Sequence, residues 1–338
     1  MKFKILIIIS FAIISILFSI AVGSVYISPI AIFQIIFYNL FGIFNIDYIH
    51  DSYVAIIWNV RLPRVILAFI VGSMLSVSGA IIQSVLRNPL ASPFTLGISS
   101  GSSFGAALVF ILGITAFEMF TLPFFGFIFG IITIIFVLFF SSKISNNMDN
   151  TTIILSGMVI SLFINAIVTL LISVNRESLQ RLIFWQMGSF SARGWDAIII
   201  LFPIAIIFIS FAYFRNLSLD IISFGEETAK TMGVNIRFEK WILLGVASLL
   251  TGSSIAFVGI IGFIDLISSH IVRRIFGSAH SKLIIFSAIF GGSFMVFSDL
   301  ISRIVIPPSE IPIGVITSLL GAPFFAYIYF KGRKNVKN

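Results

Sequence analysis

The sequence predicts an all-α integral membrane protein with about ten transmembrane helices. Hydrophobic residues make up 59% of its 338 residues and the mean hydropathy is +1.14, which is more apolar surface than a soluble protein of this length buries. Apolar runs of about 20 residues recur along the chain, the length that a helix needs to cross ~30 Å of hydrocarbon. The alternating pattern of a membrane β-barrel does not occur, so the spans are expected to be helical.

Ten candidate spans follow from these runs. The spans are expected at about residues 5–24, 63–86, 97–115, 120–141, 152–174, 196–214, 241–261, 262–276, 283–304 and 313–331. The eighth is short and contains polar residues, so a count of nine is the alternative. The first run also resembles a secretory signal, but its long apolar core favours an uncleaved helix. The loops leave no room for a soluble domain, so residues 1–338 are expected to form a single transmembrane domain.

The basic residues are divided unevenly between the two predicted faces. Of the 21 lysines and arginines, six fall on the outer face: Arg61, Arg64, Arg176, Arg181, Arg193 and Arg303. The other 15 share a face with both termini, which places the termini in the cytoplasm by the positive-inside rule. This topology explains the net charge of +8 without a nucleic-acid partner. The chain has no cysteine, which excludes disulfides and thiolate metal sites.

One inner loop is far more polar than the rest of the chain. Residues 225–241 read GEETAKTMGVNIRFEKW, and six of these 17 residues are charged in a chain with 10% charged residues. Ser223 and Glu226 have the spacing of a capping box at a helix start. Glu226 also precedes Lys230 at the i,i+4 spacing of a helical ion pair. A short helix is therefore expected at the start of this loop.

The same loop contains a stop signal and a second start signal. Gly233 is well placed to end the first helix in a left-handed conformation. Asn235 can cap a second helix that continues through Trp241 into the next span. Two short helices separated at Gly233 are expected on the cytoplasmic face. They could form a solvated loop or a docking surface for a soluble partner, and the residues alone leave both interpretations open.

Glycine and proline mark the segment from residue 61 to residue 105. Pro63 suits the first turn of a helix, where its missing N–H would be unpaired in any case. Gly72 and Gly79 lie on a small-residue face that allows close helix approach, and packing is favoured over ligand contact for each of them. The following Asn-Pro and Ser-Pro pairs break the helix, and a Gly/Ser run up to Gly105 begins another.

Polar residues inside predicted spans are functional candidates because the bilayer core makes them costly. The candidates are Gln83, Asn165, Asp265, His270 and Asp299. Asp265 and His270 are five residues apart, a poor spacing for two ligands on one helical face, so no metal site is expected. A structural role is favoured for His270. Asp299 and Arg303 have i,i+4 spacing and are expected to pair near the outer end of the ninth span.

Several activities lack their sequence signatures. The chain contains no G-x-x-x-x-G-K-[ST] loop, so any ATP that drives it must be hydrolysed by a separate polypeptide. It also lacks H-E-x-x-H and G-x-S-x-G, and no catalytic constellation or cofactor site stands out. The sequence therefore predicts a passage across the membrane rather than an enzyme.

Five segments resemble one family of membrane proteins. RLPR, SGAIIQSVLRNPLASPFTLGISSGSSFG, GEETAKTMGV, GIIGFIDLISSHIVRRIFG and SDLISR with EIPIGVITSLLGAPFF are similar, in order and spacing, to the FecCD-type permeases. These are the membrane subunits of ABC importers for ferric siderophores, haem and cobalamin. The resemblance runs from about residue 55 to residue 330. It implies the type II importer permease architecture, with ten spans and cytoplasmic termini, in the bacterial cytoplasmic membrane.

The resemblance also implies an assembly. A second copy or a related permease would enclose a central path in the lipid membrane, and two ATP-binding subunits would sit on the cytoplasmic face. A lipid-anchored or periplasmic substrate-binding protein would dock outside. Residues 220–241 look like the helices that couple to the ATPases, with Glu226, Ala229, Gly233 and Arg237 at matching places.

Two further roles are assigned by this resemblance and by residue type. Three outer arginines are similar to family arginines that pair with carboxylates of the binding protein. They are Arg61, Arg64 and Arg303. Small and polar residues of the second to fifth spans are expected to line the path, and the candidates are Gly97, Ser99, Ser100, Gly101 and Asn165. Charge complementarity at the outer face would mainly set orientation and encounter rate.

The chain departs from the family pattern around its eighth span. The family usually has Gly-Leu-Val-x-Pro-His-x-x-Arg where this chain has DLISSHIVR, so Asp265 replaces a glycine and the proline is absent. The family's Asp-His-Arg after that span appears here as Ala279, His280 and Ser281. These changes concern the local geometry of the short span.

Three functions follow as hypotheses. The first is the permease of an ATP-driven importer, with a ferric siderophore as the first choice of cargo and haem or cobalamin as alternatives. The second is a proton-coupled transporter that uses Asp265, His270 or Asp299. The third is a membrane scaffold without transport. ATP-dependent uptake with a partner ATPase would support the first, and uptake driven by a proton gradient alone would support the second.

Overall fold

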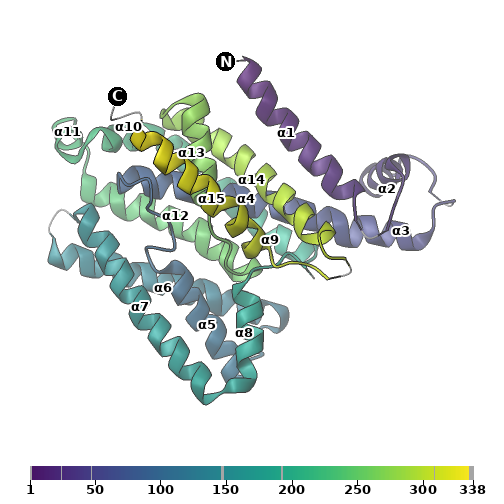
Figure 1. The fold of residues 1–338 in the computed structure, drawn as a ribbon, viewed down its shortest axis with the longest axis horizontal. Coiled ribbons are helices and arrows are strands. Elements are labelled where there is room, and N and C mark those ends of the chain that lie inside the picture. Colours follow the sequence, from purple (N-terminus) through teal and green to yellow (C-terminus); the bar gives the residue numbers. More distant parts are fainter. Residues whose placement is uncertain are drawn as a thin grey trace.

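In the computed structural model the chain folds into a bundle of helices (Figure 1). The structure describes residues 2–23, 25–46, 48–145, 148–191, 193–307 and 309–334, with side chains described as far as residue 327. Every regular element in these ranges is helical. The α-helices are α1 (Lys2–Ala21), α2 (Pro29–Phe41), α3 (Asp51–Ala55), α4 (Leu62–Val85), α5 (Ile98–Leu112), α6 (Thr121–Ile144), α7 (Asn150–Val174), α8 (Leu179–Gln186), α9 (Trp195–Phe214), α10 (Asn216–Phe224), α11 (Glu226–Thr231), α12 (Ile236–Val258), α13 (Ile264–Phe276), α14 (His280–Ile304) and α15 (Ile313–Lys334).

Helix α4 is the centre of the bundle, because it packs against α9, α12, α13 and α14. Nearly all of its side chains are buried. A Cβ atom at Gly72 would collide with the backbone oxygen of Gly291 on α14, and a Cβ atom at Gly79 would lie 2.5 Å from the backbone oxygen of Asp265 on α13. Glycine is therefore required at both crossings, and the predicted small-residue face is confirmed as a packing surface.

Pro63 lies in the first turn of α4, as predicted, although helical structure also precedes it. Helical structure continues from Asp51 to Val85, and the turn Ile56–Arg61 immediately before Pro63 is π-helical. Proline cannot donate to the carbonyl four residues earlier, and a π-helical turn accommodates such an interruption of the bonding pattern. The regular α-helix nevertheless begins at Leu62, next to the predicted start.

Helices α5, α6 and α7 form a second group that packs through α6 and α5 on α12 (Figure 1). Gly101 allows α5 to cross α6 closely, since a Cβ atom there would collide with Thr133. Helix α7 packs on α5 and α6 with one side and is otherwise largely exposed. Its exposed side chains are mostly apolar, as expected of a surface that faces lipid or another membrane helix.

Each of the ten predicted spans corresponds to a helix. Among the described residues, seven helical stretches are long and apolar enough to cross a membrane. The predicted spans 97–115, 262–276 and 313–331 correspond to α5, α13 and α15, whose described apolar parts are shorter. The sequence did not predict α2, which begins with the Ser28 cap and ends at Gly42 with φ +67°.

The two chain ends lie at one end of the bundle, which we call the terminal face. Helix α1 begins there and α15 ends there, and α10 and α11 lie on the same face (Figure 1). Helix α11 and the start of α12 are the two predicted short helices. Gly233 between them has φ +82°, and the Asn235 side chain accepts the Phe238 N–H, so both of these predictions are confirmed.

Two local predictions at the terminal face are wrong. Ser223 does not cap α11, because its hydroxyl donates to the backbone oxygen of Asp220 and the cap position is Gly225. Glu226 pairs with Lys240 on α12, at 2.7 Å, instead of with Lys230 one turn along. Lys230 remains exposed. Burial of the long-range pair outweighs the small gain from a local pair on a solvated helix.

Candidate functional site

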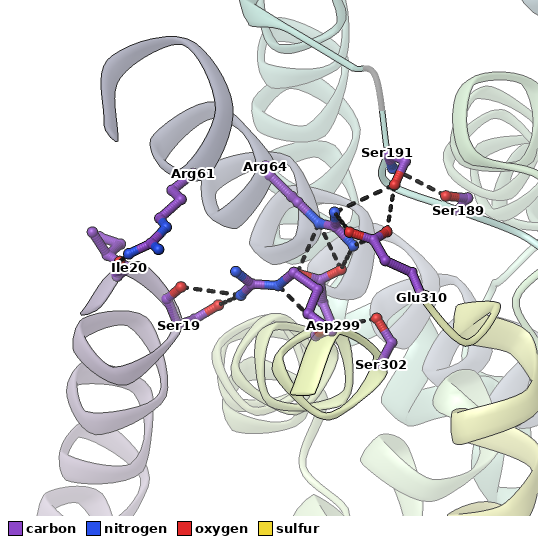
Figure 2. Close-up of polar contacts among 10 residues, drawn as sticks. Ser19, Ile20, Arg61, Arg64, Ser189, Ser191, Asp299, Ser302 and Glu310 are labelled. Carbon is purple, nitrogen blue, oxygen red and sulfur yellow. Dashed lines mark hydrogen bonds and ion pairs between the residues drawn. The ribbon is translucent and has the colours of Figure 1, made fainter. Parts of the chain in front are cut away.

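At the end of the bundle opposite the terminal face, Arg64 forms the centre of a buried ion cluster. Its Nη2 donates to Asp299 Oδ1 at 2.8 Å, and its Nη1 donates to Glu310 Oε1 at 2.7 Å. Figure 2 shows the guanidinium between these two carboxylates. The Ser191 hydroxyl accepts from Arg64 Nη1 at 3.3 Å and donates to Glu310 Oε2 at 2.5 Å. Such fork-shaped contacts fix position as well as charge.

Arg303 joins the same cluster to α1. Its Nε lies 3.2 Å from Asp299 Oδ2, which confirms the predicted i,i+4 pair. Its Nη2 donates to the hydroxyl of Ser19 at 2.6 Å and to the backbone oxygen of Ser19 at 3.0 Å. Asp299 is fully buried, and its carboxylate pairs with both Arg64 and Arg303.

Arg61 has a different set of partners. Its Nη1 donates to the backbone oxygens of Ile20 and Ala21, at 3.0 and 3.1 Å, and its Nη2 donates to that of Val25. The first two are unpaired carbonyls at the C-terminal end of α1. A cation is favourable at this end of a helix because of the helix dipole. Arg61 therefore anchors the end of α1 against the helix that begins at Asp51.

Glu310 is the most exposed member of the cluster and lies in the loop between α14 and α15. Its side chain is 38% exposed. Partial burial raises its pKa, but hydrogen bonds from Arg64 and Ser191 and the charges of Arg64 and Arg303 outweigh this effect, so the pKa lies below the usual value. The carboxylate is ionised at neutral pH and closes the cluster from the outside.

The three arginines assigned by resemblance to docking are not free in this structure. Arg61 and Arg64 are buried, at 5% and 7% exposure, and the Arg303 side chain is 9% exposed. Arg64 and Arg303 already pair with carboxylates of their own chain. A contact with a partner's carboxylate would have to replace or extend these pairs, so the docking role stays a prediction.

Sequence reasoning found Asp299 and Arg303 but missed Glu310 and Ser191. These two residues lie far from Arg64 along the chain, and no local spacing connects them. One signal was available: two arginines beside a predicted span need acid partners within the protein, because unpaired charges are not buried. Glu310 lies in the EIPIG segment already used for the resemblance.

The bundle contains an open cavity of about 670 Å³ beside α13 and α15. Its wall is formed by Ser92 and Phe94, by the end of α8, by residues 260–263, by the start of α13 and by the first turns of α15. Most of the wall is apolar, and among the described residues that line it Asp265 alone has an acidic or basic side chain. A cavity of this size and composition is typical of sites for small-molecule ligands.

Asp265 is buried in the wall of this cavity, near the start of α13. It is 1% exposed, and neither carboxylate oxygen has a hydrogen-bond partner among the described residues. Gln83 donates to its backbone oxygen at 3.4 Å, so the side chain gains nothing from that contact. Where the family pattern has glycine, this chain therefore holds an unpaired buried acid.

The predicted path residues do not line the cavity. Gly97, Ser99, Ser100 and Gly101 lie buried at the start of α5, where Gly97 contacts α6 and α7 and Gly101 contacts α6. Asn165 is exposed on α7, away from the cavity wall. In a single chain the first four residues act as packing residues, and any role for Asn165 in a path requires a second chain beside α7.

The terminal face carries a polar platform, which we define as α10, α11 and the start of α12 (residues 216–241). Ala229 is fully buried beneath it, while Gly233 and Arg237 are exposed. Lys240 is fully buried and donates to Glu226 Oε1 at 2.7 Å and to the backbone oxygen of Met148 at 2.6 Å. These bonds fix α11 on α12 and on the loop after α6. Phe224, Met232 and Phe238 are exposed on the platform at 75%, 59% and 54%.

This arrangement has a polar platform at one end, an arginine cluster at the other and a cavity between, and comparison with known proteins assigns it to a family. The sequence profile of the FecCD transport family matches residues 11–331. The chain belongs to the FecCD transport family. It is the permease subunit of an ABC transporter and is not itself an enzyme.

Two relatives and one solved structure place this permease more closely. It is 40% identical over 324 residues to an uncharacterized ABC transporter permease protein, YvrB, of Bacillus subtilis. The aligned region covers 95% of this chain and 92% of that relative. It is 35% identical to the Fe(3+)-citrate import system permease protein YfmE of the same species, over 94% and 91% of the two chains. A transporter assigned to the metal-chelate type, solved in an inward-facing conformation, has a TM-score of 0.83 and 29% identity over 96% of this chain and 97% of its own. The type II importer permease fold is thereby confirmed.

Proposed function

We propose that this permease imports a metal chelate, driven by ATP that partner subunits hydrolyse. The similarity in shape to a metal-chelate-type ABC transporter over nearly the whole chain carries this proposal. A ferric chelate is the preferred cargo class, with a ferric siderophore first and haem or cobalamin as alternatives. The similarity to the Fe(3+)-citrate import permease supports iron in particular.

The assembly follows from the placement of the polar features. A second copy of the chain, or a related permease, would complete the path, and two ATP-binding subunits would contact the platform. A binding protein would dock at the end that carries the arginine cluster. This arrangement makes the terminal face cytoplasmic, with the protein in the bacterial cytoplasmic membrane and both termini inside. The excess of basic residues at that face agrees with the positive-inside rule.

The cavity beside α13 and α15 is the better candidate for this chain's part of the path. Its wall is mostly apolar and open on one side. Such a surface lets a chelate pass without trapping it, because it offers few hydrogen-bonding groups. Gly97, Ser99, Ser100, Gly101 and Asn165 would then act behind or beside the path.

The coupling role belongs to Glu226, Ala229, Gly233 and Arg237. Glu226 and Ala229 fix α11 to the bundle, while Gly233 and Arg237 are exposed for a partner. Movement of the platform must stabilise one conformation of the path relative to the other. Otherwise ATP binding could not shift the equilibrium between these two conformations. At the outer end, Arg61, Arg64 and Arg303 would orient the binding protein, with Glu310 giving way to a carboxylate of the partner.

Uptake by the reconstituted transporter tests the cargo class. The permease, its ATPase subunits and its binding protein are placed in proteoliposomes with labelled ferric citrate, a ferric hydroxamate, haem or cobalamin. We expect saturable uptake of one ferric chelate. An excess of the same chelate without label should suppress this uptake. Uptake of none of these compounds by an assembly that hydrolyses ATP would contradict the proposal.

A further inference from the structure

Helix α10 lies between the platform's outermost helix and the centre of the bundle. Helix α11 packs against α10 and α12, whereas α10 packs against α4, α9 and α14. Any displacement of α11 by a partner can therefore reach α4 and α14 through α10. The contact between α10 and those two helices is one route for that displacement, and the route through α12 reaches α4 but not α14.

A single carboxylate makes the polar part of this contact. Asp220 of α10 points its Oδ1 at His280, the first residue of α14. That oxygen accepts the backbone N–H of His280 at 3.0 Å and lies 2.6 Å from the ring Nδ1. A carboxylate oxygen accepts in both bonds, so Nδ1 carries a proton. Asp220 thus holds both the ring of His280 and an otherwise unpaired amide at the start of α14.

The other side of the same imidazole contacts α4. The His280 Nε2 atom lies 2.6 Å from the hydroxyl of Ser84. Arg273 of α13 donates to that hydroxyl at 2.5 Å. One chain of hydrogen bonds, Asp220 to His280 to Ser84 to Arg273, therefore joins α10, α14, α4 and α13.

The network is buried where it meets the bundle. His280 is completely buried and Ser84 is 4% exposed. The Asp220 side chain is 29% exposed, so the pair lies at the edge of the buried region. Breaking it would leave the buried Nδ1 of His280 without a protein partner, which is costly. The contact between Asp220 and His280 therefore holds α10 against α14.

We propose that Asp220 and His280 form the joint that passes movement of the platform to α4 and α14. The pair stays formed through the transport cycle, so α10 moves together with the ends of α4 and α14. Both are positioning residues that contact neither cargo nor nucleotide. This inference rests on the proposed function, because it requires a partner that moves the platform.

The pair is tested in the complete transporter in proteoliposomes by measuring uptake and ATP hydrolysis side by side. The variants are Asp220→Ala, His280→Ala and the double variant, and the probes are labelled ferric citrate, a ferric hydroxamate, haem and cobalamin. Each single variant should keep ATP hydrolysis and lose about tenfold in chelate taken up per ATP hydrolysed. The double variant should lose no more than either single variant, since both act through one contact.

Two further variants separate the joint from a general structural effect. Asp220→Asn keeps an oxygen that can accept both bonds and should restore most of the uptake per ATP. Arg215→Ala removes another ion pair of the same face, Arg215 to Glu239 at 2.7 Å, which leads to α12 and not to α14. Its uptake per ATP should stay near that of the wild type.

The possible results are distinct. Three results would overturn the role of the pair as a joint. They are a parallel loss of uptake and ATP hydrolysis in Asp220→Ala, additive losses of uptake per ATP in the double variant, and an equal loss of uptake per ATP in Arg215→Ala. A wild-type assembly that shows no ATP-dependent uptake of any of the four probes would instead overturn the proposed function. Wild-type uptake together with a fully coupled Asp220→Ala variant would reject the joint alone.

Discussion

Two buried aspartates of this permease have opposite surroundings. Asp299 accepts from Arg64 and Arg303, whereas Asp265 has no partner for either carboxylate oxygen among the described residues. Both are at most 1% exposed. Because a buried polar group is costly unless it is paired, the same substitution at the two positions should act in opposite directions.

Asp265→Ala should stabilise the purified permease, since it removes two unsatisfied oxygens, by about 1–2 kcal/mol after allowing for the lost interaction with the helix start. Asp299→Ala should destabilise it by about 3–5 kcal/mol, because it leaves buried Arg303 without a carboxylate partner and Arg64 with Glu310 alone. Thermal unfolding in detergent, followed by intrinsic tryptophan fluorescence, measures both. A lower melting temperature for Asp265→Ala would show that the carboxyl group has a stabilising partner within the purified permease and would contradict this prediction.

Glu310 should make the outer cluster sensitive to acid. Its folded pKa lies below the usual value, so its contribution to stability is complete above the unfolded pKa of about 4.3 and is lost as pH falls through the folded pKa. The melting temperature of the wild type should therefore fall more steeply below about pH 4.3 than that of Glu310→Gln. Equal pH profiles for the two proteins would mean that the pair between Glu310 and Arg64 adds nothing to the stability of the fold.

At the scale of elements, glycines determine how closely the central helices approach. A Cβ atom at Gly72 would collide with the backbone of α14, while a Cβ atom at Gly245 on α12 would meet nothing within 4 Å. Gly72→Ala should cost about 1–3 kcal/mol through forced displacement of α14. Gly245→Ala should instead stabilise by about 0.5–1 kcal/mol, because alanine favours the helix. Melting temperatures that move in the same direction would contradict this packing.

Gly233 separates α11 from α12 with a backbone conformation that side chains disfavour. Its φ is +82° and its surroundings are open, so Gly233→Val is disfavoured by the backbone and not by a collision. A β-branched residue at this angle costs about 1–3 kcal/mol and should reorient α11. In reconstituted vesicles this variant should hydrolyse ATP with little uptake, whereas Gly245→Ala should couple normally. Normal coupling of Gly233→Val would remove the platform from the mechanism.

The sequence predicted helices well where apolar runs are long, because one apolar run of that length has only one stable form in a membrane. It also predicted the left-handed Gly233, the Asn235 cap and the Asp299–Arg303 pair, since each depends on neighbouring residues. The capping box at Ser223 failed because its hydroxyl donates to the backbone oxygen of Asp220, one turn earlier in the same helix. The pair between Glu226 and Lys230 failed because Lys240 on α12 competes for the same carboxylate, and no local spacing reveals that partner.

The candidate site was predictable to a smaller extent. Resemblance located the arginines, but their pairing with Glu310 and the carbonyls of α1 depends on how distant helices meet. The cavity wall is built from four separate segments of the chain, so no local sequence pattern could reveal it. Of the predicted path residues, Gly97 and Gly101 lie in close contact with α6 or α7, since small residues serve close packing as readily as passage. Their role in a path stays a prediction.

At the scale of the whole molecule, the permease connects two polar ends through a tightly packed centre. The arginine cluster joins α1, α4 and α14 at one end, and the Asp220–His280 network joins α4, α10, α13 and α14 at the other. Helices α4 and α14 take part in both. A movement at the platform can therefore reach the outer end through these two helices without a separate relay.

The source of energy is the central claim, and one measurement tests it most directly. The permease is reconstituted with and without its ATPase subunits, and uptake of labelled ferric chelate is followed with ATP inside or with a proton gradient alone. The account predicts uptake only with ATP and the ATPase subunits, unchanged when the proton gradient is collapsed. Uptake at full rate from a proton gradient, with no ATPase present, would contradict it.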